Sequence, residues 1–253
     1  MVLAIFRMPA LAVTIGAAVT VPLLSLASAQ AAAGGDVGGR GPASAGASAP
    51  SVVNNRVFAG YQASVAAGSA TSSAAQFKVP KLSCTSAFRG ISPGAGVVVN
   101  AFRSVSSAFV FVVCRSGRAV YFPALVINGN EVNYPRTAVH AGNVIKVSAK
   151  VTTRATTVQV TDVTTGVTKK RTGTGARSSA AFAGDSSVIA NGVVLGVPRF
   201  GTLTFTHCLI DGRALARAHP ARYQRVNRRN ILQIATGALS SGGTAFPTYY
   251  KHF

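Results

Sequence analysis

The chain has 253 residues, of which 25 are Lys or Arg and 5 are Asp or Glu, and its formal net charge is +20. Hydrophobic residues make up 48%, enough to form the core of one sizeable domain, and this excludes a collagen repeat and a charged disordered chain. The few acids are too scattered for an EF-hand loop or a two-metal phosphatase site, and there is no HExxH, Walker or CxxC motif. The sequence therefore predicts no metal site and no cofactor.

The chain begins with a pattern typical of an export signal. A single basic residue, Arg7, precedes the uncharged apolar stretch 10–26, which ends in the small-residue site Ala27-Ser28-Ala29. This order predicts a signal peptide over residues 1–29 and a secreted mature protein that starts near Gln30. The alternative is a retained membrane anchor, since the stretch is only slightly shorter than the ~20 residues that a membrane span needs.

Residues 30–55 are rich in Ala, Gly, Ser and Pro and have no periodic apolar face. This composition predicts a flexible, disordered linker. It would hold the folded domain away from a surface or a secretion complex, or would be a leader without a role of its own.

Residues 56–215 are predicted to form an all-β domain. Short segments rich in Val, Thr, Phe and Tyr alternate with Gly, Asn, Ser and Pro, and no clear helix pattern interrupts them. The candidate strands are 57–65, 76–80, 97–102, 108–113, 119–127, 144–151, 157–163, 167–171 and 202–208. Short strands at this spacing predict a two-sheet antiparallel β-sandwich.

Particular segments support this interpretation. In 157–163, Val alternates with Thr and Gln, which indicates one buried face and one solvated face. Residues 109–113 are apolar on both faces and are expected to form a central strand. Thr164-Thr165-Gly166 and Arg115-Ser116-Gly117-Arg118 are predicted to be tight hairpin turns, because Gly adopts a positive φ at little cost.

The strand pattern fails after about Leu215, so residues 216–253 are predicted to be a basic tail with a short helix near Ile231 to Ala235. Six arginines gather at its start: Arg213, Arg217, Arg222, Arg225, Arg228 and Arg229. With Lys169-Lys170-Arg171, they would attract polyanions, and in an exported protein these are anionic cell-surface polymers, lipid head groups or nucleic acid. A high-GC codon bias is the alternative explanation of the composition.

Three cysteines, Cys84, Cys114 and Cys208, lie in the exported part of the chain. An oxidising compartment favours one disulfide and one leftover thiol. The residue pattern alone leaves all three pairings open.

Short motifs along the domain resemble, in order, those of the eqolisins, the secreted glutamic acid peptidases. They are Gly60-Tyr61, Phe77-Lys78-Val79-Pro80 with Leu82-Ser83-Cys84, Phe88-Arg89-Gly90-Ile91, the hairpin ending in Thr164-Thr165-Gly166, Arg177-Ser178-Ser179-Ala180, and Phe200-Gly201-Thr202-Leu203-Thr204-Phe205-Thr206. The family shows GY, W-x-VP, a Cys, WVGI, a hairpin ending in TTG, the lead-in to an AEWIVE strand and FGTVTFT.

The resemblance implies a two-sheet β-sandwich of the concanavalin-like jelly-roll kind and secretion. In true members it also implies hydrolysis of peptides at acid pH by a Gln and Glu pair without a cofactor. The family has a Cys in two loops on one side of the sandwich, which implies a disulfide between Cys84 and Cys114.

The catalytic positions of the family are altered here. Aligned without a gap, the first acid of AEWIVE becomes Ala181 and the later one falls on Asp185. The catalytic Gln becomes Asn100 or Ser107, depending on the placement of a gap, and the Glu of the family's YEMYP strand becomes Val120.

Counting acids narrows the candidates for proton transfer. Asp162 and Asp211 adjoin turns, where side chains usually bind local backbone donors, and Glu131 lies in a Gly- and Asn-rich segment. This leaves Asp185, which with Asn100 would imitate a shortened catalytic pair, or would cap a turn after Gly184. We expect the two not to share a water, which would leave the scaffold without catalysis.

The order of His140, Asp162 and Ser186 matches that of a chymotrypsin-like triad. The separation of His140 from Ser186 is too short for the two β-barrels that build such a site, and the segment around Ser186 lacks the glycines of an oxyanion hole. The sequence therefore favours a secreted, non-catalytic binding or surface protein, whose partners are anionic cell-surface polymers or a polypeptide. The alternative is an acid endopeptidase with a divergent catalytic pair.

Overall fold

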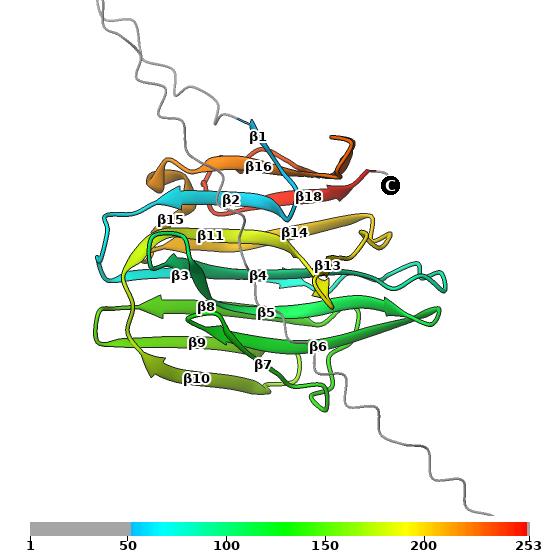
Figure 1. The fold of residues 1–253 in the computed structure, drawn as a ribbon, viewed down its shortest axis with the longest axis horizontal. Coiled ribbons are helices and arrows are strands. Elements are labelled where there is room, and N and C mark those ends of the chain that lie inside the picture. The colour runs from blue at the N-terminus through cyan, green and yellow to red at the C-terminus, as the bar shows by residue number, and fades with distance from the viewer. Residues whose placement is uncertain (1–51, 252–253) are drawn as a thin grey trace, which may run out of the picture.

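A computed structural model describes residues 52–251, whose regular secondary structure is β-strand apart from one short 3-10 helix (Figure 1). The first strands are β1 (Val52–Asn55), β2 (Phe58–Ser64), β3 (Thr71–Lys78), β4 (Arg89–Val99), β5 (Ser104–Arg115), β6 (Arg118–Ile127), β7 (Asn130–Asn133), β8 (Val144–Val151) and β9 (Ala155–Asp162). They are followed by β10 (Thr168–Thr174), β11 (Ser178–Ser187), β12 (Ile189–Ala190), β13 (Val193–Val194), β14 (Thr202–Ile210), β15 (Arg213–Ala214), the 3-10 helix η1 (Leu215–Ala218), β16 (Ala221–Val226), β17 (Leu232–Thr236) and β18 (Phe246–Tyr250). The expected signal peptide and most of the expected linker lie outside the described residues.

Sixteen strands form one continuous sheet in the order β10-β9-β8-β3-β14-β18-β17-β16-β2-β11-β4-β5-β6-β7, with β1 and β15 joined at its side. The sheet curls back on itself, so that β4, β5 and β6 contact β3, β8, β9 and β10 without being their hydrogen-bonded neighbours. We call β2, β11, β4, β5, β6 and β7 the groove sheet, and β10, β9, β8, β3 and β14 the back sheet. Neighbours along this path are antiparallel, which confirms the predicted antiparallel all-β sandwich.

The main core lies between the two layers. On β8, buried Ile145 and Val147 alternate with outward Lys146 and Ser148, as a strand with one solvated face requires. Within this core, the ring centroids of Phe77 on β3 and Phe205 on the neighbouring β14 lie 5.6 Å apart. This layer of apolar side chains holds the back sheet against the groove sheet.

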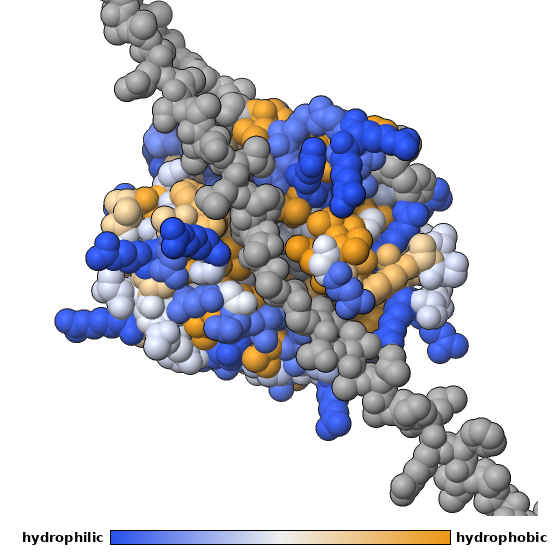
Figure 2. Space-filling model, viewed as in Figure 1, coloured by the Kyte–Doolittle hydropathy of each residue, from blue (hydrophilic) through white to orange (hydrophobic). Residues whose placement is uncertain are grey.

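A second apolar cluster covers the opposite face of the groove sheet. Its rings come from Phe58, Phe109, Phe111, Phe122 and Phe182. Strand β5 therefore buries both of its faces, as the sequence predicted. Figure 2 shows apolar side chains gathered on this side of the molecule near β13.

The hairpin turns form where the sequence placed them. Gly166 adopts φ 75° between β9 and β10, and Ser116 and Gly117 adopt φ 48° and 76° between β5 and β6. Strand β8 has the predicted bounds, whereas β3, β4 and β5 are longer than expected.

The segment after Leu215 differs most from expectation. The helix expected near Ile231 to Ala235 is wrong: this segment forms β17, in which Ile234 and Thr236 are buried in alternation. Strands β16, β17 and β18 connect β2 of the groove sheet to β14 of the back sheet. The predicted basic tail therefore contributes three strands to the sheet. At the other end of the domain, Val52–Asn55, expected to be linker, pairs with β16 as a parallel strand.

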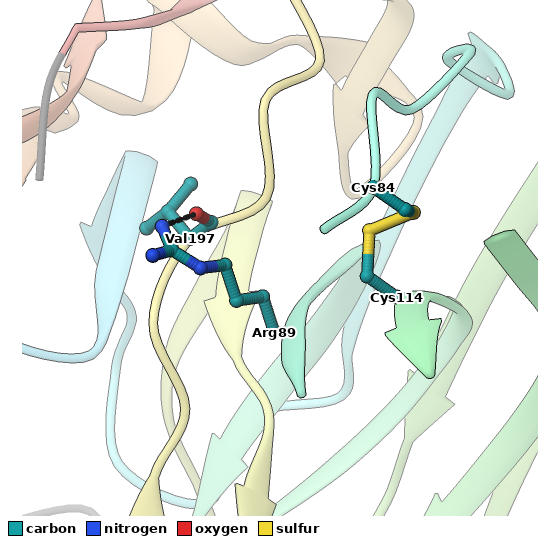
Figure 3. The surroundings of a disulfide bond; sticks show 4 residues. All are labelled: Cys84, Arg89, Cys114 and Val197. Carbon is teal, nitrogen blue, oxygen red and sulfur yellow. Dashed lines mark hydrogen bonds between the residues drawn. A yellow bond between two sulfur atoms is a disulfide. The ribbon is translucent and has the colours of Figure 1, made fainter. Parts of the chain in front are cut away.

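A disulfide joins Cys84, in the loop after β3, to Cys114 at the end of β5, with 5.4 Å between the Cα atoms (Figure 3). Beside it, the Arg89 guanidinium donates to the Val197 carbonyl oxygen over 3.4 Å. The pairing that the family resemblance implied is confirmed. Cys208 is free and buried, and burial raises the pKa of its thiol to about 12.

Removing the disulfide should destabilise the domain. The bond closes a loop with a sequence separation of 30, and restricting such a loop in the unfolded chain contributes about 3 kcal/mol in the chain-entropy estimate. We expect the double variant Cys84→Ala/Cys114→Ala to lose about this much unfolding free energy in urea. A reductant should destabilise the wild type and leave the variant unchanged; an equal response of both would place the effect elsewhere.

Candidate functional site: the groove over strands β2 to β7

A groove lies on the face of the groove sheet that points away from the main core. It has a volume of about 110 Å³. Its lining is Asn55, Val57, Phe58, Gln62, Ser92, Gly94, Ala95, Val98, Val105, Ser107, Ala108, Phe109, Phe111, Glu131, Phe182, Ser186, Ser187 and Ile189. The floor is thus largely apolar and aromatic, with scattered hydroxyl groups, two amides and one carboxyl group.

One line of directly opposed residues crosses the groove sheet from β2 to β7. It runs through Gln62, Phe182, Gly96, Ser107, Val126 and Glu131. Since neighbouring strands lie ~4.8 Å apart, its two ends are separated by about 24 Å measured along the sheet. The amide of Gln62 and the carboxyl of Glu131 therefore lie at opposite ends of the groove.

The absence of a side chain at Gly96 shapes the floor between these ends. A Cβ atom at this position would lie 2.6 Å from the Ser107 Cβ and 2.7 Å from the Phe182 ring. The ring occupies this space and meets Phe58 edge to face, with 5.6 Å between centroids. Gly96 thus leaves room for the Phe182 ring in the centre of the groove floor.

Glu131 is the one acidic residue of the groove lining. It is half-buried on β7, and its Oε1 atom is buried without a hydrogen-bond partner among the described residues. Burial raises the pKa of its carboxyl to about 7, against the effect of a hydrogen bond from the Asn133 side chain. The Gly- and Asn-rich segment around this residue does not indicate a site from the sequence alone. The Asn128-Gly129 pair is typical of a tight hairpin turn, and such a turn would place Glu131 on a strand.

The structure does not bring Asp185 and Asn100 together. Asp185 lies within β11, opposite Pro93, with its carboxyl group fully buried away from the groove. Asn100 is exposed in the turn after β4, about 23 Å along the strand from Pro93. Asp185 does not cap a turn either, because it pairs on both sides with neighbouring strands.

The Asp185 carboxyl is nevertheless unusual. Its Oδ2 accepts a hydrogen bond of 2.6 Å from the Thr248 hydroxyl, whereas its Oδ1 has no hydrogen-bond partner within residues 52–251. Burial raises the pKa of this carboxyl to about 7, opposed by the Thr248 hydrogen bond and by the charge of Arg225. This carboxyl connects β11 to β18 inside the molecule and does not face a ligand.

The other residues considered for catalysis do not lie together in one site either. Ala181 faces the main core, and Val120 is exposed on β6, whereas Ser107 lies in the groove floor. The Asp162 carboxyl is buried, binds the Asn143 amide and accepts hydrogen bonds from the backbone N–H groups after it. Asp162 therefore stabilises its own turn, as expected from its position.

The chymotrypsin-like set has no support in the structure. His140 is exposed in the turn before β8, and Ser186 lines the groove at the end of β11. The Asp162 carboxyl is already bound to local donors, so no acid orients the imidazole of His140.

The six arginines do not form one surface patch. Arg225 is buried, and its Nη2 donates to the Leu195 carbonyl oxygen over 2.7 Å. Arg213 and Arg217 lie before β16, whereas Arg228 and Arg229 lie in the turn after it. Strand β16 separates these two pairs, and Arg225 has a structural role.

Residues 52–251 offer neither a metal site nor a membrane-spanning helix. No group of three or more His, Cys, Asp or Glu side chains is arranged to hold a metal ion. No helix in this part of the chain has the length and apolar character needed to cross a membrane.

The fold is shared with solved glutamic peptidases. No family model and no curated protein sequence matches the chain. Scytalido-glutamic peptidase with a transition state analog inhibitor superposes with a TM-score of 0.61 and 16% identity, over 77% of this chain and 100% of that one. SCP-B, a member of the Eqolisin family in a complex with a tripeptide, gives 0.58 and 16% over the same shares, and aspergilloglutamic peptidase from Aspergillus niger gives 0.52 and 15% over 64% and 99%. The chain therefore has the glutamic peptidase fold, as the sequence motifs implied.

The buried carboxyl of Asp185 predicts a pH dependence of stability. Its pKa rises from 3.8 to about 7 on folding, so the folded protein holds a proton that the unfolded chain releases near pH 4. Stability should be fully present below pH 4 and should fall as the pH rises to 7, by at most about 1.4 kcal/mol per pH unit.

Urea unfolding at intervals between pH 4 and pH 8 measures this slope. The variant Asp185→Asn keeps an acceptor for Thr248 and removes the titrating group, so its slope should be smaller than that of the wild type. A slope that this variant leaves unchanged would contradict the assignment to Asp185.

Proposed function

We propose that this protein is a secreted, non-catalytic binding protein on a glutamic peptidase fold, and that its groove binds an extended polypeptide through an apolar side chain. The observation that carries the proposal is the groove itself, which has an aromatic floor and whose one carboxyl group, on Glu131, lies at the end opposite to the Gln62 amide. The disulfide and the signal-like residues 1–29 support export, because disulfides persist in oxidising compartments.

The dimensions of the groove suit one large side chain of a ligand. An apolar cavity of ~150 Å³ takes a molecule the size of benzene, and the groove provides about 110 Å³ between the rings of Phe58, Phe109 and Phe182. Ser107 and Ser186 add hydroxyl groups along the same surface, which can bind the backbone of a ligand. The similar SCP-B structure holds a tripeptide, and this supports a polypeptide as the ligand.

The position and protonation of Glu131 argue against acid peptidase chemistry. A general base must be ionised and must lie close to the water that it activates, while a second group stabilises the oxyanion. With a pKa of about 7, Glu131 is protonated at acid pH and cannot take a proton there. Gln62, the amide in the same line of residues, lies at the far end of the groove.

The alternative function is an endopeptidase that uses Glu131. It is favoured by the raised pKa of a carboxyl in a groove, which is typical of catalytic acids. The neighbouring Asn133 amide would then serve as the second polar group of a divergent pair. In that case Glu131→Gln would abolish cleavage.

The two functions are separated by a cleavage and binding experiment. Casein and a set of apolar peptides are incubated with the protein between pH 2 and pH 8, and peptide binding is measured by calorimetry. We expect no cleavage at any of these pH values and measurable binding of peptides with an aromatic side chain. Cleavage that is lost in Glu131→Gln would overturn the non-catalytic assignment.

Filling the groove should remove peptide binding. In Ser107→Leu, the larger side chain occupies the floor beside Gly96 and Phe182, so we expect binding to weaken at least about tenfold, as the loss of one buried apolar side chain implies. The matched control is Ser148→Leu, on the outer face of β8. If both variants bind like the wild type while remaining folded by circular dichroism, the groove is not the binding site.

A further inference from the structure

The outer face of the back sheet is largely uniform in its chemistry. Most outward positions of its central strands β3, β8 and β9 carry Ser, Thr, Gln or Lys, and the exceptions are Ala74, Val144 and Ala155. Strand β10 continues the face with Thr and Lys170, and β14 continues it with Thr and, beside Ala74, Leu209. Three of its lysines, Lys146, Lys150 and Lys170, are exposed. This face is therefore polar and positively charged, in contrast to the apolar groove on the other side of the molecule.

The acids of residues 52–251 lie away from the centre of this face. Glu131 is in the groove, while Asp185 and Asp162 are buried. Asp211 lies in the turn after β14, where its carboxylate accepts a hydrogen bond of 2.6 Å from the Ser72 backbone N–H and one of 3.4 Å from the Ser72 hydroxyl, at the end of β3 opposite Lys150. The lysines of the face consequently have no acidic side chain among the outward positions of these strands.

The hydroxyl and amide groups between the lysines are held in place by one another. Thr161 and Thr168 pair across the strands with 3.0 Å between their hydroxyl oxygens, and the Gln159 amide donates to the Thr161 hydroxyl over 3.1 Å. These side chains stand on a sheet whose backbone is fixed by its neighbours. A ligand would therefore meet donors and acceptors that are already ordered, which lowers the entropic cost of binding.

The three lysines surround this polar cluster. Lys146 and Lys150 are four positions apart on β8, which corresponds to about 13 Å, and Lys170 lies two strands away, about 10 Å across the sheet. Gln159 lies directly between Ser148 and Lys170. Positive charges at these spacings can engage several separate anionic groups of one extended molecule, with hydrogen-bonding groups between them.

We propose that the outer face of the back sheet binds an acidic polysaccharide. Its ammonium groups would bind carboxylate groups on the polymer, and its hydroxyl and amide groups would bind the sugar hydroxyls between them. Single-stranded nucleic acid fits less well, because the central strands offer no aromatic ring on which a base could stack. A membrane surface also fits less well, because the positions between the three lysines carry Ser, Thr and Gln and offer no apolar side chain to insert into lipid. This inference is independent of the groove, which lies on the opposite layer.

Removing charge from this face, with an equal removal elsewhere, tests the proposal. The face variant is Lys146→Gln/Lys150→Gln/Lys170→Gln. The control is Arg118→Gln/Arg228→Gln/Arg229→Gln, which removes three exposed positive charges at the β5–β6 and β16–β17 turns. Binding to sodium polygalacturonate is measured by calorimetry at about 0.15 M salt, where distant charges are screened. We expect the face variant to bind about tenfold more weakly than the control.

Other results would overturn the proposal. An equal loss in the control would mean that net charge alone attracts the polymer. Equal binding to neutral dextran would remove the role of the charges. Tighter binding to DNA, or to vesicles of phosphatidylglycerol, that depends on the same lysines would assign the face to another class of partner. The groove variant Ser107→Leu should keep its affinity for polygalacturonate, so failure of the proposed function leaves this test intact.

Discussion

Strands β4, β5 and β11 bury side chains on both of their faces. Other parts of the molecule must therefore cover each face of this part of the sheet. One face packs against the back sheet through residues such as Val110 and Val112, and the other carries the rings of Phe109 and Phe182. A sheet with two apolar faces needs two covers. The back sheet covers the first face, whereas the second is the floor of the groove, and its apolar surface is the basis of the proposed binding function.

The parts of the fold that could be predicted from the sequence are those whose strands pair with the next strand along the chain. The β8, β9 and β10 segments alternate with period two and are joined by a glycine turn, so their pairing could be inferred from the chain itself. Strands β16, β17 and β18 are short, and the two pairings that join them to the rest of the sheet, β16 with β2 and β18 with β14, connect residues distant in sequence. Arg225, which reads as a surface charge, is buried because the Leu195 carbonyl oxygen accepts its hydrogen bond.

The candidate site was harder to predict for a related reason. Sequence comparison with the glutamic peptidases directs attention to β11, where Asp185 follows the family motif, yet the alternation of the strand turns this carboxyl group away from the groove. Glu131 lies in the groove only because β7 folds back beside β6. Which face a side chain joins depends on register, and a shift of one residue reverses it.

Closure of the sheet by the last strands also determines when the domain can form. β2 pairs with β16 and β14 pairs with β18, so the two layers are joined by hydrogen bonds only after residues near the C-terminus are available. Pairings this distant along the chain slow folding, because much of the chain must be ordered before they form. Until β16, β17 and β18 are in place, only the apolar core between the groove sheet and the back sheet can hold the two layers together.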